Sequence, residues 1–229
     1  MKDVCKERAE SGCPGTEECS LLKEIALLRE RCLKLEELSF VDALTGLFNF
    51  RYMQKALEIE MERTRRTRIP TGLIMADLDH FKKVNDFYGH ECGNAALSLV
   101  GKVLKESVRI IDVPCRYGGE EFAIILPGAS LREAVRIAER LSENIRYSPV
   151  VFGKESVTLA ASFGVAVFHS SDESTMDEFL RRADELLYEA KNSGRNLIRS
   201  EPYSPMQQPD EVTVDEKAEL LAAMRGEEP

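Results

Sequence analysis

The 229-residue sequence has no apolar run close to the roughly 20 residues that a membrane-spanning helix needs. Its charged N-terminal stretch also lacks the apolar core of a signal peptide. On these absences we expect a cytoplasmic protein with no membrane partner. A chain of this length can bury one sizeable core and carry short appendages.

The chain also lacks an excess of basic residues, with 31 Lys and Arg against 40 Asp and Glu and a net charge of −9. Surfaces that bind nucleic acid polymers are usually basic. We therefore expect no nucleic acid polymer as a partner. A phosphate ester would need a local group of cations to overcome the overall negative field.

The six cysteines lack the paired spacing of a zinc site. Cys5, Cys13 and Cys19 crowd the first twenty residues, but they form no CxxC pair, and all three histidines lie beyond residue 79. In a cytoplasmic protein we expect thiols rather than disulfides. Incidental thiols on a loose terminus are favoured, and a metal or redox role stays open.

The pattern divides the chain into four segments. Residues 1–19 are expected to be irregular, 20–39 a helical stalk, 40–200 a folded domain, and 201–229 a linker with a short helix. In the last segment, "TVDE" reads as a capping box ahead of "KAELLAAM". That helix could dock on the domain or stay solvated.

The stalk carries apolar residues at alternating spacings of four and three, which is typical of a coiled-coil seam. These residues are Leu21, Ile25, Leu28, Cys32 and Leu35. Two heptads are short for a coiled coil. An amphipathic helix packed on its own domain remains the alternative, and the flanking charges favour a dimerising helix.

Within the folded domain, helices and apolar strands alternate. Helices are predicted near 50–66, 91–108, 130–146 and 175–192, the last with Gly194 as a C-cap. Strands are predicted in "LIMADLD", in a hairpin around Gly118 and Gly119, in "VTLAASFGVAVF" and in "NLIR". The order β-α-β-β-α-β predicts an α+β, ferredoxin-like palm: a mostly antiparallel sheet with helices on one face.

Carboxylates stand at the ends of two of these strands. Asp77 and Asp79 end a buried strand and point to the same side. The stretch "CRYGGEEFAIILP" places Glu120 at a tight turn against an apolar run. A surface hairpin with a charged turn would look similar. Carboxylates from two neighbouring strands can, however, hold Mg²⁺ together with substrate phosphates, and such ions polarise a phosphoryl group.

Five motifs, in order, resemble the GGDEF family of diguanylate cyclases, in its GGEEF form. They are "DALTGLFN", "DLDHFKKVNDFYGHECGN", "RIIDVPCRYGGEEF", "SFGVAV" and "ADELLYEAKNSGRN", and they span about two-thirds of the chain, from Asp42 to Arg199. The resemblance implies a nucleotidyltransferase that condenses two GTP molecules into cyclic di-GMP and releases two pyrophosphates. It also implies Mg²⁺ or Mn²⁺, two ions per site, and a homodimer in which two domains face each other.

The resemblance also assigns residues. It implies that Asp77, Glu120 and the backbone carbonyl of Leu78 bind the metal, and that Glu120 helps to deprotonate the attacking hydroxyl. Lys82 is implied to act in catalysis, and Asp79 is expected to shape its turn rather than bind metal. The implied substrate-binding residues are Phe81, Lys82, Asn85, Asn94, Gly118, Gly119, Lys191 and Arg195. The two glycines let the nucleotide lie against the backbone.

One position departs from the family pattern. Asn85 stands where the family places an asparagine against guanine, but Asn94 replaces the usual aspartate. A carboxylate accepts from both N1–H and the 2-amino group of guanine, whereas an amide accepts once and donates once. Either the enzyme has relaxed base specificity and also makes cyclic GMP-AMP, or the replacement is tolerated with a water remaking the contact. The second reading is favoured.

A second site is implied just upstream of the GGEEF turn. Arg109 and Asp112 match the family's RxxD product site, and Arg140 falls where a further arginine completes it. Arginine forks suit phosphate and the Hoogsteen edge of guanine. We expect cyclic di-GMP to bind there and inhibit.

Three readings of the chain are therefore compared. An active cyclic dinucleotide synthase is favoured because Asp77, Glu120, Lys82 and Arg195 are all present. A catalytically silent module that only binds cyclic di-GMP is second. A dimerising adaptor is third.

Overall fold

The computed structural model describes residues 24–31, 40–153 and 155–203. Residues 24–31 form an exposed helical segment within the range predicted for the stalk. The N-terminal cysteines, the rest of the coiled-coil seam and the capping box of the tail lie outside the described residues, so those predictions stay untested. In the described part of the chain, no helix has both the length and the apolarity to cross a membrane.

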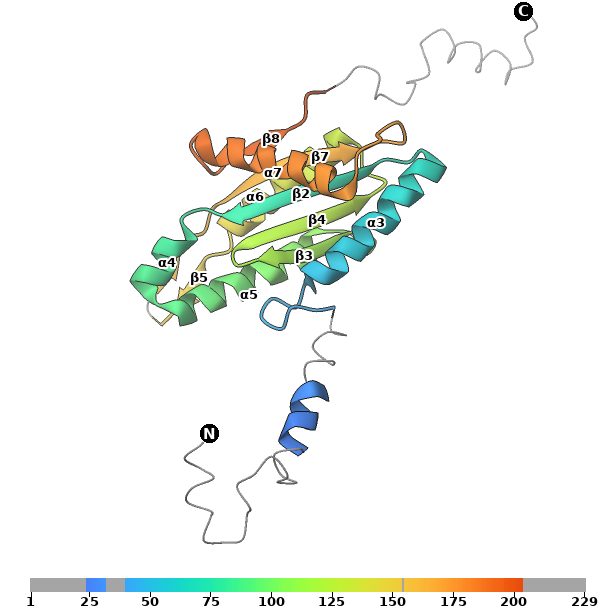
Figure 1. Ribbon diagram of the computed structural model, residues 1–229. Helices are drawn as coiled ribbons and strands as arrows, with labels where there is room; N and C mark the ends of the chain where they lie inside the picture. Colours follow the sequence, from blue (N-terminus) through green and yellow to red (C-terminus); the bar gives the residue numbers. More distant parts are fainter. Residues whose placement is uncertain (1–23, 32–39, 154, 204–229) are drawn as a thin grey trace, which may run out of the picture.

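A six-stranded sheet in the order β1-β3-β4-β2-β7-β8 forms the centre of the domain (Figure 1). Its strands are β1 (Phe48–Asn49), β2 (Thr71–Leu78), β3 (Val113–Gly118), β4 (Glu121–Pro127), β7 (Ala161–Phe168) and β8 (Ile198–Ser200). The central pairs β3–β4, β4–β2 and β2–β7 are antiparallel, and only the outer pairs β1–β3 and β7–β8 are parallel. The predicted α+β class with a mostly antiparallel sheet is confirmed.

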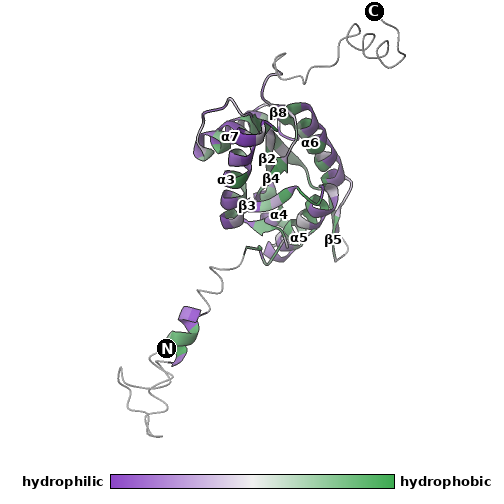
Figure 2. Cartoon of the chain, turned by 90° about the vertical axis from the view of Figure 1, so that its right-hand side faces the viewer, coloured by the Kyte–Doolittle hydropathy of each residue, from purple (hydrophilic) through white to green (hydrophobic). Residues whose placement is uncertain are grey.

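Helices cover both faces of this sheet, so the prediction of helices on one face is wrong. Figure 2 shows α3 (Phe50–Thr67) and α7 (Met176–Asn192) on one side, and α5 (His90–Ser107) and α6 (Leu131–Arg146) on the other. The reason lies in β2, whose eight residues are all buried. Leu73 and Met75 pack in the core under α3 and α7, while Ile74 and Ala76 pack in the core under α5 and α6. An unbroken apolar strand is typical of a sheet covered on both sides.

The four predicted helices lie within one or two residues of α3, α5, α6 and α7. A further helix, α4 (Phe81–Tyr88), was not predicted, because it is only eight residues long and follows closely on a strand. The predicted long strand is interrupted. A small hairpin of β5 (Val150–Phe152) and β6 (Glu155–Val157) precedes β7, and residues 158–160 lie between β6 and β7. Helix α7 ends in the C-cap Ser193, one residue before the predicted Gly194.

Helix α7 lies directly on the backbone of β7. A Cβ atom added at Gly164 would come within 2.1 Å of the Ala183 carbonyl oxygen on α7. Only glycine allows so close an approach of helix and strand. The position of α7 on the sheet is therefore set by backbone against backbone.

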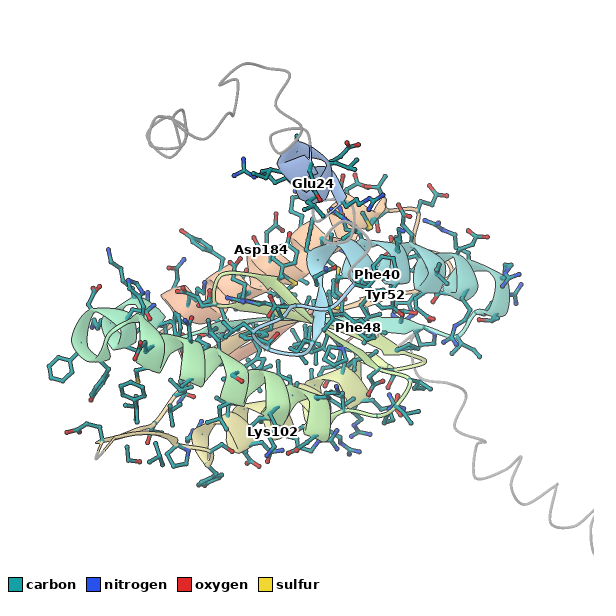
Figure 3. The ribbon with its side chains drawn as sticks, turned by 90° about the horizontal axis from the view of Figure 1, so that it is seen from below. Glu24, Phe40, Phe48, Tyr52, Lys102 and Asp184 are labelled. Carbon is teal, nitrogen blue, oxygen red and sulfur yellow. The ribbon has the colours of Figure 1, made fainter. Side chains whose placement is uncertain are left out.

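The chain enters the domain through an aromatic cluster, visible in Figure 3. The ring of Tyr52 on α3 stacks on Phe48, with centroids 4.0 Å apart, and is tilted against Phe40 at 5.4 Å. Asn49 caps α3 by accepting a hydrogen bond from the Tyr52 amide. These contacts hold the start of the domain against α3.

Candidate active site

The two predicted metal-binding carboxylates come together at one edge of the sheet. Strands β2 and β4 are antiparallel neighbours, and their register pairs Asp77 with Glu121, the residue after Glu120. The Leu78 amide donates to the Glu120 carbonyl at 3.3 Å. Gly119, with φ of +40°, turns the chain between β3 and β4 just before Glu120. Sheet register thus places Asp77, Leu78 and Glu120 beside one another.

Asp77 is nearly buried and faces two cations. Its Oδ2 lies 2.8 Å from the Nζ of Lys191, at the end of α7. Burial raises the pKa of Asp77 above its ordinary value of 3.8, and the Lys191 and Arg195 charges oppose that rise. The structure therefore brings Lys191 and Arg195 to the carboxylate edge, although they lie more than 110 positions away in the sequence.

The glutamates of the turn are also perturbed. Burial, followed by the negative charge of Asp77, raises the pKa of both Glu120 and Glu121 above the ordinary 4.5. Crowded carboxylates of this kind suit a divalent cation, which relieves their repulsion. Among the described residues no group of three or more His, Cys, Asp or Glu side chains forms a complete cage. This donor set fits an Mg²⁺-type ion that takes two carboxylates, a carbonyl and substrate oxygens.

Helix α4 begins immediately after these carboxylates. The Phe81 side chain is buried in the core on the α5 side, so only its backbone N–H can face a ligand. Lys82, in the same first turn, is exposed. The first N–H groups of a helix lack intrahelical partners and favour anions. Phe81 and Lys82 are therefore placed where backbone donors could face a phosphate chain.

Asp79, two residues beyond Asp77, is engaged by the protein itself. Its Oδ1 accepts a hydrogen bond from the Ser162 hydroxyl, and its Oδ2 accepts one from the Asn196 amide, both at 2.8 Å. These contacts agree with the predicted turn-shaping role.

The two predicted base-recognition amides lie where α4 and α5 meet. The helices join at Gly89, and Asn85 packs so closely on α5 that a Cβ at Gly93 would lie 1.9 Å from the Asn85 Oδ1. Asn94, the next residue after Gly93, is exposed. The corner therefore presents Asn85 and Asn94 on adjoining helices. A cavity of about 680 Å³ lies beside α4, lined by residues such as His80, Phe87 and Ala160, and holds neither of these amides.

The residues of the predicted product site also lie together. The Arg109 amide donates to the Asp112 Oδ2 at 2.7 Å, and the Asp112 amide donates back to the Arg109 carbonyl at 3.0 Å. Arg140, on α6, donates to the Ser107 carbonyl at 2.7 Å, next to this turn. The Asp112 side chain is fully buried, yet its Oδ1 has no partner within the described structure.

One residue of the site, Arg116 on β3, was not predicted from the sequence. Its guanidinium donates to the Gly119 carbonyl at 3.1 and 2.7 Å and also pairs with Asp42 at 3.2 Å. Asp42 in turn accepts from the Thr45 amide and hydroxyl. Both residues stand in recognised motifs, but nothing local in the sequence indicates that the motifs touch.

Comparison with known proteins indicates one family. The profile described as "Diguanylate cyclase, GGDEF domain" matches residues 39–197. The chain is 42% identical over 164 residues to Response regulator PleD of Caulobacter vibrioides, covering 71% of this chain and 36% of PleD. It is 38% identical over 178 residues to Diguanylate cyclase VdcA of Vibrio cholerae, covering 76% of this chain and 51% of VdcA. The chain thus spans about a third to a half of these relatives.

A solved structure shows the same fold. Diguanylate cyclase SiaD of Pseudomonas aeruginosa, crystallised with its activator SiaC, superimposes with a TM-score of 0.69 at 32% identity, over 86% of this chain and 76% of SiaD. The active GGEEF domain of a Vibrio cholerae diguanylate cyclase matches with a TM-score of 0.63 at 29% identity, over 68% of this chain and 98% of that domain. The profile match covers well over half of the sequence, and the chain belongs to the GGDEF family of diguanylate cyclases.

Proposed function

We propose that this chain condenses two GTP molecules into cyclic di-GMP. The observation that carries the proposal is the meeting of Asp77 and Glu120 at one sheet edge, with the Lys191 ammonium 2.8 Å from Asp77. Acidic groups for a metal and basic groups for phosphates are therefore adjacent. An enzyme that had lost catalysis would be free to lose this arrangement.

The reaction consists of two equivalent steps. In each, the 3′-oxygen of one GTP attacks the α-phosphorus of the other, and a new P–O bond forms. The bond from the α-phosphorus to the bridging oxygen breaks, pyrophosphate leaves with its electron pair, and the hydroxyl proton passes to a base or to solvent. Because each domain binds one GTP, two domains of a homodimer must face each other, and catalysis is mainly positioning and charge neutralisation.

We propose the following roles, which the positions of the residues support. Asp77, Glu120 and the Leu78 carbonyl would hold Mg²⁺ or Mn²⁺, two ions per site, and such ions polarise the α-phosphate and lower the pKa of the attacking hydroxyl. Glu120, whose pKa is raised, is suited to accept that proton. Lys82, Lys191, Arg195 and the first amides of α4 would bind the triphosphate. Gly118 and Gly119 would let the nucleotide lie against the turn.

We assign product inhibition to Arg109, Asp112 and Arg140. The assignment is supported by the closed turn between Arg109 and Asp112 and by Arg140, which donates to the Ser107 carbonyl beside that turn. The ligand at this site would be cyclic di-GMP, the product of the proposed reaction. Arg109 and Arg140 would face its phosphates and base edges.

A second candidate function concerns the base. Asn94 is exposed beside Asn85, and an amide can pair with adenine by accepting from its 6-amino group and donating to N1. The protein would then also make cyclic GMP-AMP. Losing one charge-assisted hydrogen bond to guanine costs about 1.5–3 kcal/mol, which corresponds to about one to two decades of selectivity.

One experiment separates these possibilities. The protein, stripped of nucleotide, is incubated with Mg²⁺ and equimolar GTP and ATP, and the products are identified by mass spectrometry, with Glu120→Gln as the control. Cyclic di-GMP alone supports a strict cyclase and overturns the second candidate. Cyclic GMP-AMP in addition supports relaxed specificity. If no cyclic product forms but cyclic di-GMP still binds, the protein is a silent binding module. If there is neither product nor binding, the dimerising adaptor is the remaining reading.

A further inference from the structure

We infer that Asp79, together with Ser162, is a positioning residue that fixes the backbone at Arg195 and so aims this arginine at the nucleotide triphosphate. The inference rests on the proposed function only in taking Arg195 as a phosphate-binding residue. In this role Asp79 positions the backbone and does not bind a metal ion.

The first observation is the backbone after α7. Arg195 and Asn196 have φ values of +63° and +49°, so two consecutive non-glycine residues adopt the left-handed conformation. Side chains other than glycine rarely adopt it, and such residues persist only where their surroundings hold them. The conformation of Arg195 therefore needs a restraint from outside its own segment.

The second observation is that restraint. The Asn196 amide donates to the Asp79 Oδ2 at 2.8 Å and to the Ser162 Oγ at 3.1 Å. The Ser162 hydroxyl donates to the other oxygen of Asp79 at 2.8 Å. Ser162 is fully buried in β7, so this triangle joins the loop to the rigid centre of the sheet.

Two further bonds act on the same loop. The Arg195 amide donates to the Ala190 carbonyl at 3.1 Å, which ends α7. The Arg146 Nη2, at the end of α6, donates to the Asn196 Oδ1 at 2.9 Å. Asn196 is thus held through its amide by Asp79 and through its side chain by Arg146.

Asp79 and the predicted metal ligand Asp77 are close neighbours in the sequence. Asp79 lies two residues after Asp77, at the end of the same strand. The predicted metal carboxylate and the anchor of the phosphate arginine are therefore set by one short segment of backbone. Loss of the anchor should move Arg195 relative to Asp77 and leave the base corner at Asn85 undisturbed.

A metal-binding role for Asp79 makes the opposite prediction for one substitution. Asn has the shape of Asp, and an asparagine at 79 can still accept from the Asn196 amide while donating to the Ser162 Oγ. Asp79→Asn should therefore preserve the anchor, whereas a carboxylate needed for a metal ion would be lost. Asp79→Ala removes both functions.

The test measures binding. We would determine, in Mg²⁺, the affinity of wild type, Asp79→Ala, Asp79→Asn and Arg195→Ala for guanosine 5′-(α,β-methylene)triphosphate and for GMP, which lacks the β- and γ-phosphates. We expect Asp79→Ala to weaken triphosphate binding about tenfold, the size of one lost charge-assisted contact, with GMP binding unchanged and Asp79→Asn close to wild type. In the Arg195→Ala background, Asp79→Ala should cause little further loss.

The matched control is Asp172→Ala. Asp172 is also a loop aspartate near α7 with both oxygens engaged, by the Ser174 amide and by Arg182, but it follows the opposite end of β7. It should lower the melting temperature without selective loss of triphosphate binding. If Asp79→Ala does not fold, Arg146→Ala perturbs Asn196 from the surface and should shift triphosphate affinity in the same direction. Its own control is Arg181→Ala, which breaks an exposed pair with Glu185.

Several outcomes would overturn the inference: Asp79→Asn as weak as Asp79→Ala, additive losses with Arg195→Ala, or equal losses for GMP and the triphosphate. Wild type that binds the analogue while Asp79→Ala binds it equally well defeats the inference alone. Wild type that does not bind the analogue defeats the proposed function as well.

Discussion

Arg116 pairs with Asp42 at 3.2 Å across 74 positions of sequence, and the same guanidinium holds the Gly119 carbonyl of the GGEEF turn. Both side chains are mostly buried, which strengthens such a contact relative to a surface pair. Burial opposes ionisation of Asp42, but the hydrogen bonds from Thr45 and the charge of Arg116 prevail and hold its pKa below the ordinary 3.8. The segment by which the chain enters the domain is thus tied to the turn that carries Glu120.

We predict that Arg116→Ala and Asp42→Ala each lower kcat/KM for cyclic di-GMP formation about tenfold. Each substitution removes or weakens the contacts by which Arg116 holds the GGEEF turn. Their effects should be coupled by about 1 kcal/mol in a double-mutant cycle. The cycle is measured on kcat/KM and on urea unfolding, with Lys102→Ala as the control, since its pair with Glu106 is exposed and 3.9 Å long. Strictly additive losses would show that the two motifs act separately.

Glu120→Gln should abolish product formation, by about a hundredfold or more, without destabilising the metal-free protein. The pKa of Glu120 is raised in the fold, so its ionised form opposes folding. That penalty is complete above the folded pKa, shrinks as the pH falls through it, and disappears below the ordinary value of 4.5. The melting temperature of Glu120→Gln should therefore exceed that of wild type at pH 8 and equal it near pH 4. A lower melting temperature at pH 8 would contradict the assigned electrostatics.

Gly93→Ala tests the base corner. The new Cβ would meet the Asn85 Oδ1, the end of a movable side chain, so Asn85 should turn away while α5 stays intact. Alanine also favours a helix by up to about 1 kcal/mol over glycine. We expect unchanged or higher stability, a KM for GTP raised about tenfold, and the same effect as Asn85→Ala. A variant that keeps its GTP affinity would show that Asn85 is not needed in its present orientation.

Arg109→Ala tests the product site. The Arg109 side chain is half exposed and its Nε contacts the Asp112 Oδ2 at 3.4 Å, so its loss should weaken cyclic di-GMP binding about tenfold or more, as calorimetry would show. Arg140→Ala should act in the same direction. Reaction time courses should then continue to higher product concentrations. Unaltered binding in both variants would place the inhibitor elsewhere.

The order of elements and the carboxylate edge could be predicted from sequence because both are local. Strand "LIMADLD" and turn "GGEEF" carry their ligands at their own ends, and sheet register brings them together. The second helical layer was not predicted, although the apolar run Leu73–Ala76 of β2 is typical of a sheet covered on both faces, because the ferredoxin-like order favours helices on one face. Helix α4 could not be predicted because its eight residues are too few to show a helical period.

The contacts that hold the site could not be predicted in this way. Asp79 meets Asn196 across 117 positions, and Asp42 meets Arg116 across 74. Each partner is an ordinary polar residue whose local pattern indicates only a turn or a surface. Such pairs are visible only once the sheet order is known.

Gly164 sets the distance between α7 and β7 at the point where they meet. At Gly164 the backbone of α7 lies against the backbone of β7, so any larger residue at 164 would push the helix away from the sheet. Lys191 lies near the C-terminal end of that helix, which rises about 1.5 Å per residue. A small tilt of α7 at Gly164 would therefore displace the Lys191 ammonium. The distance between Lys191 and Asp77 thus depends on the absence of a Cβ atom at Gly164.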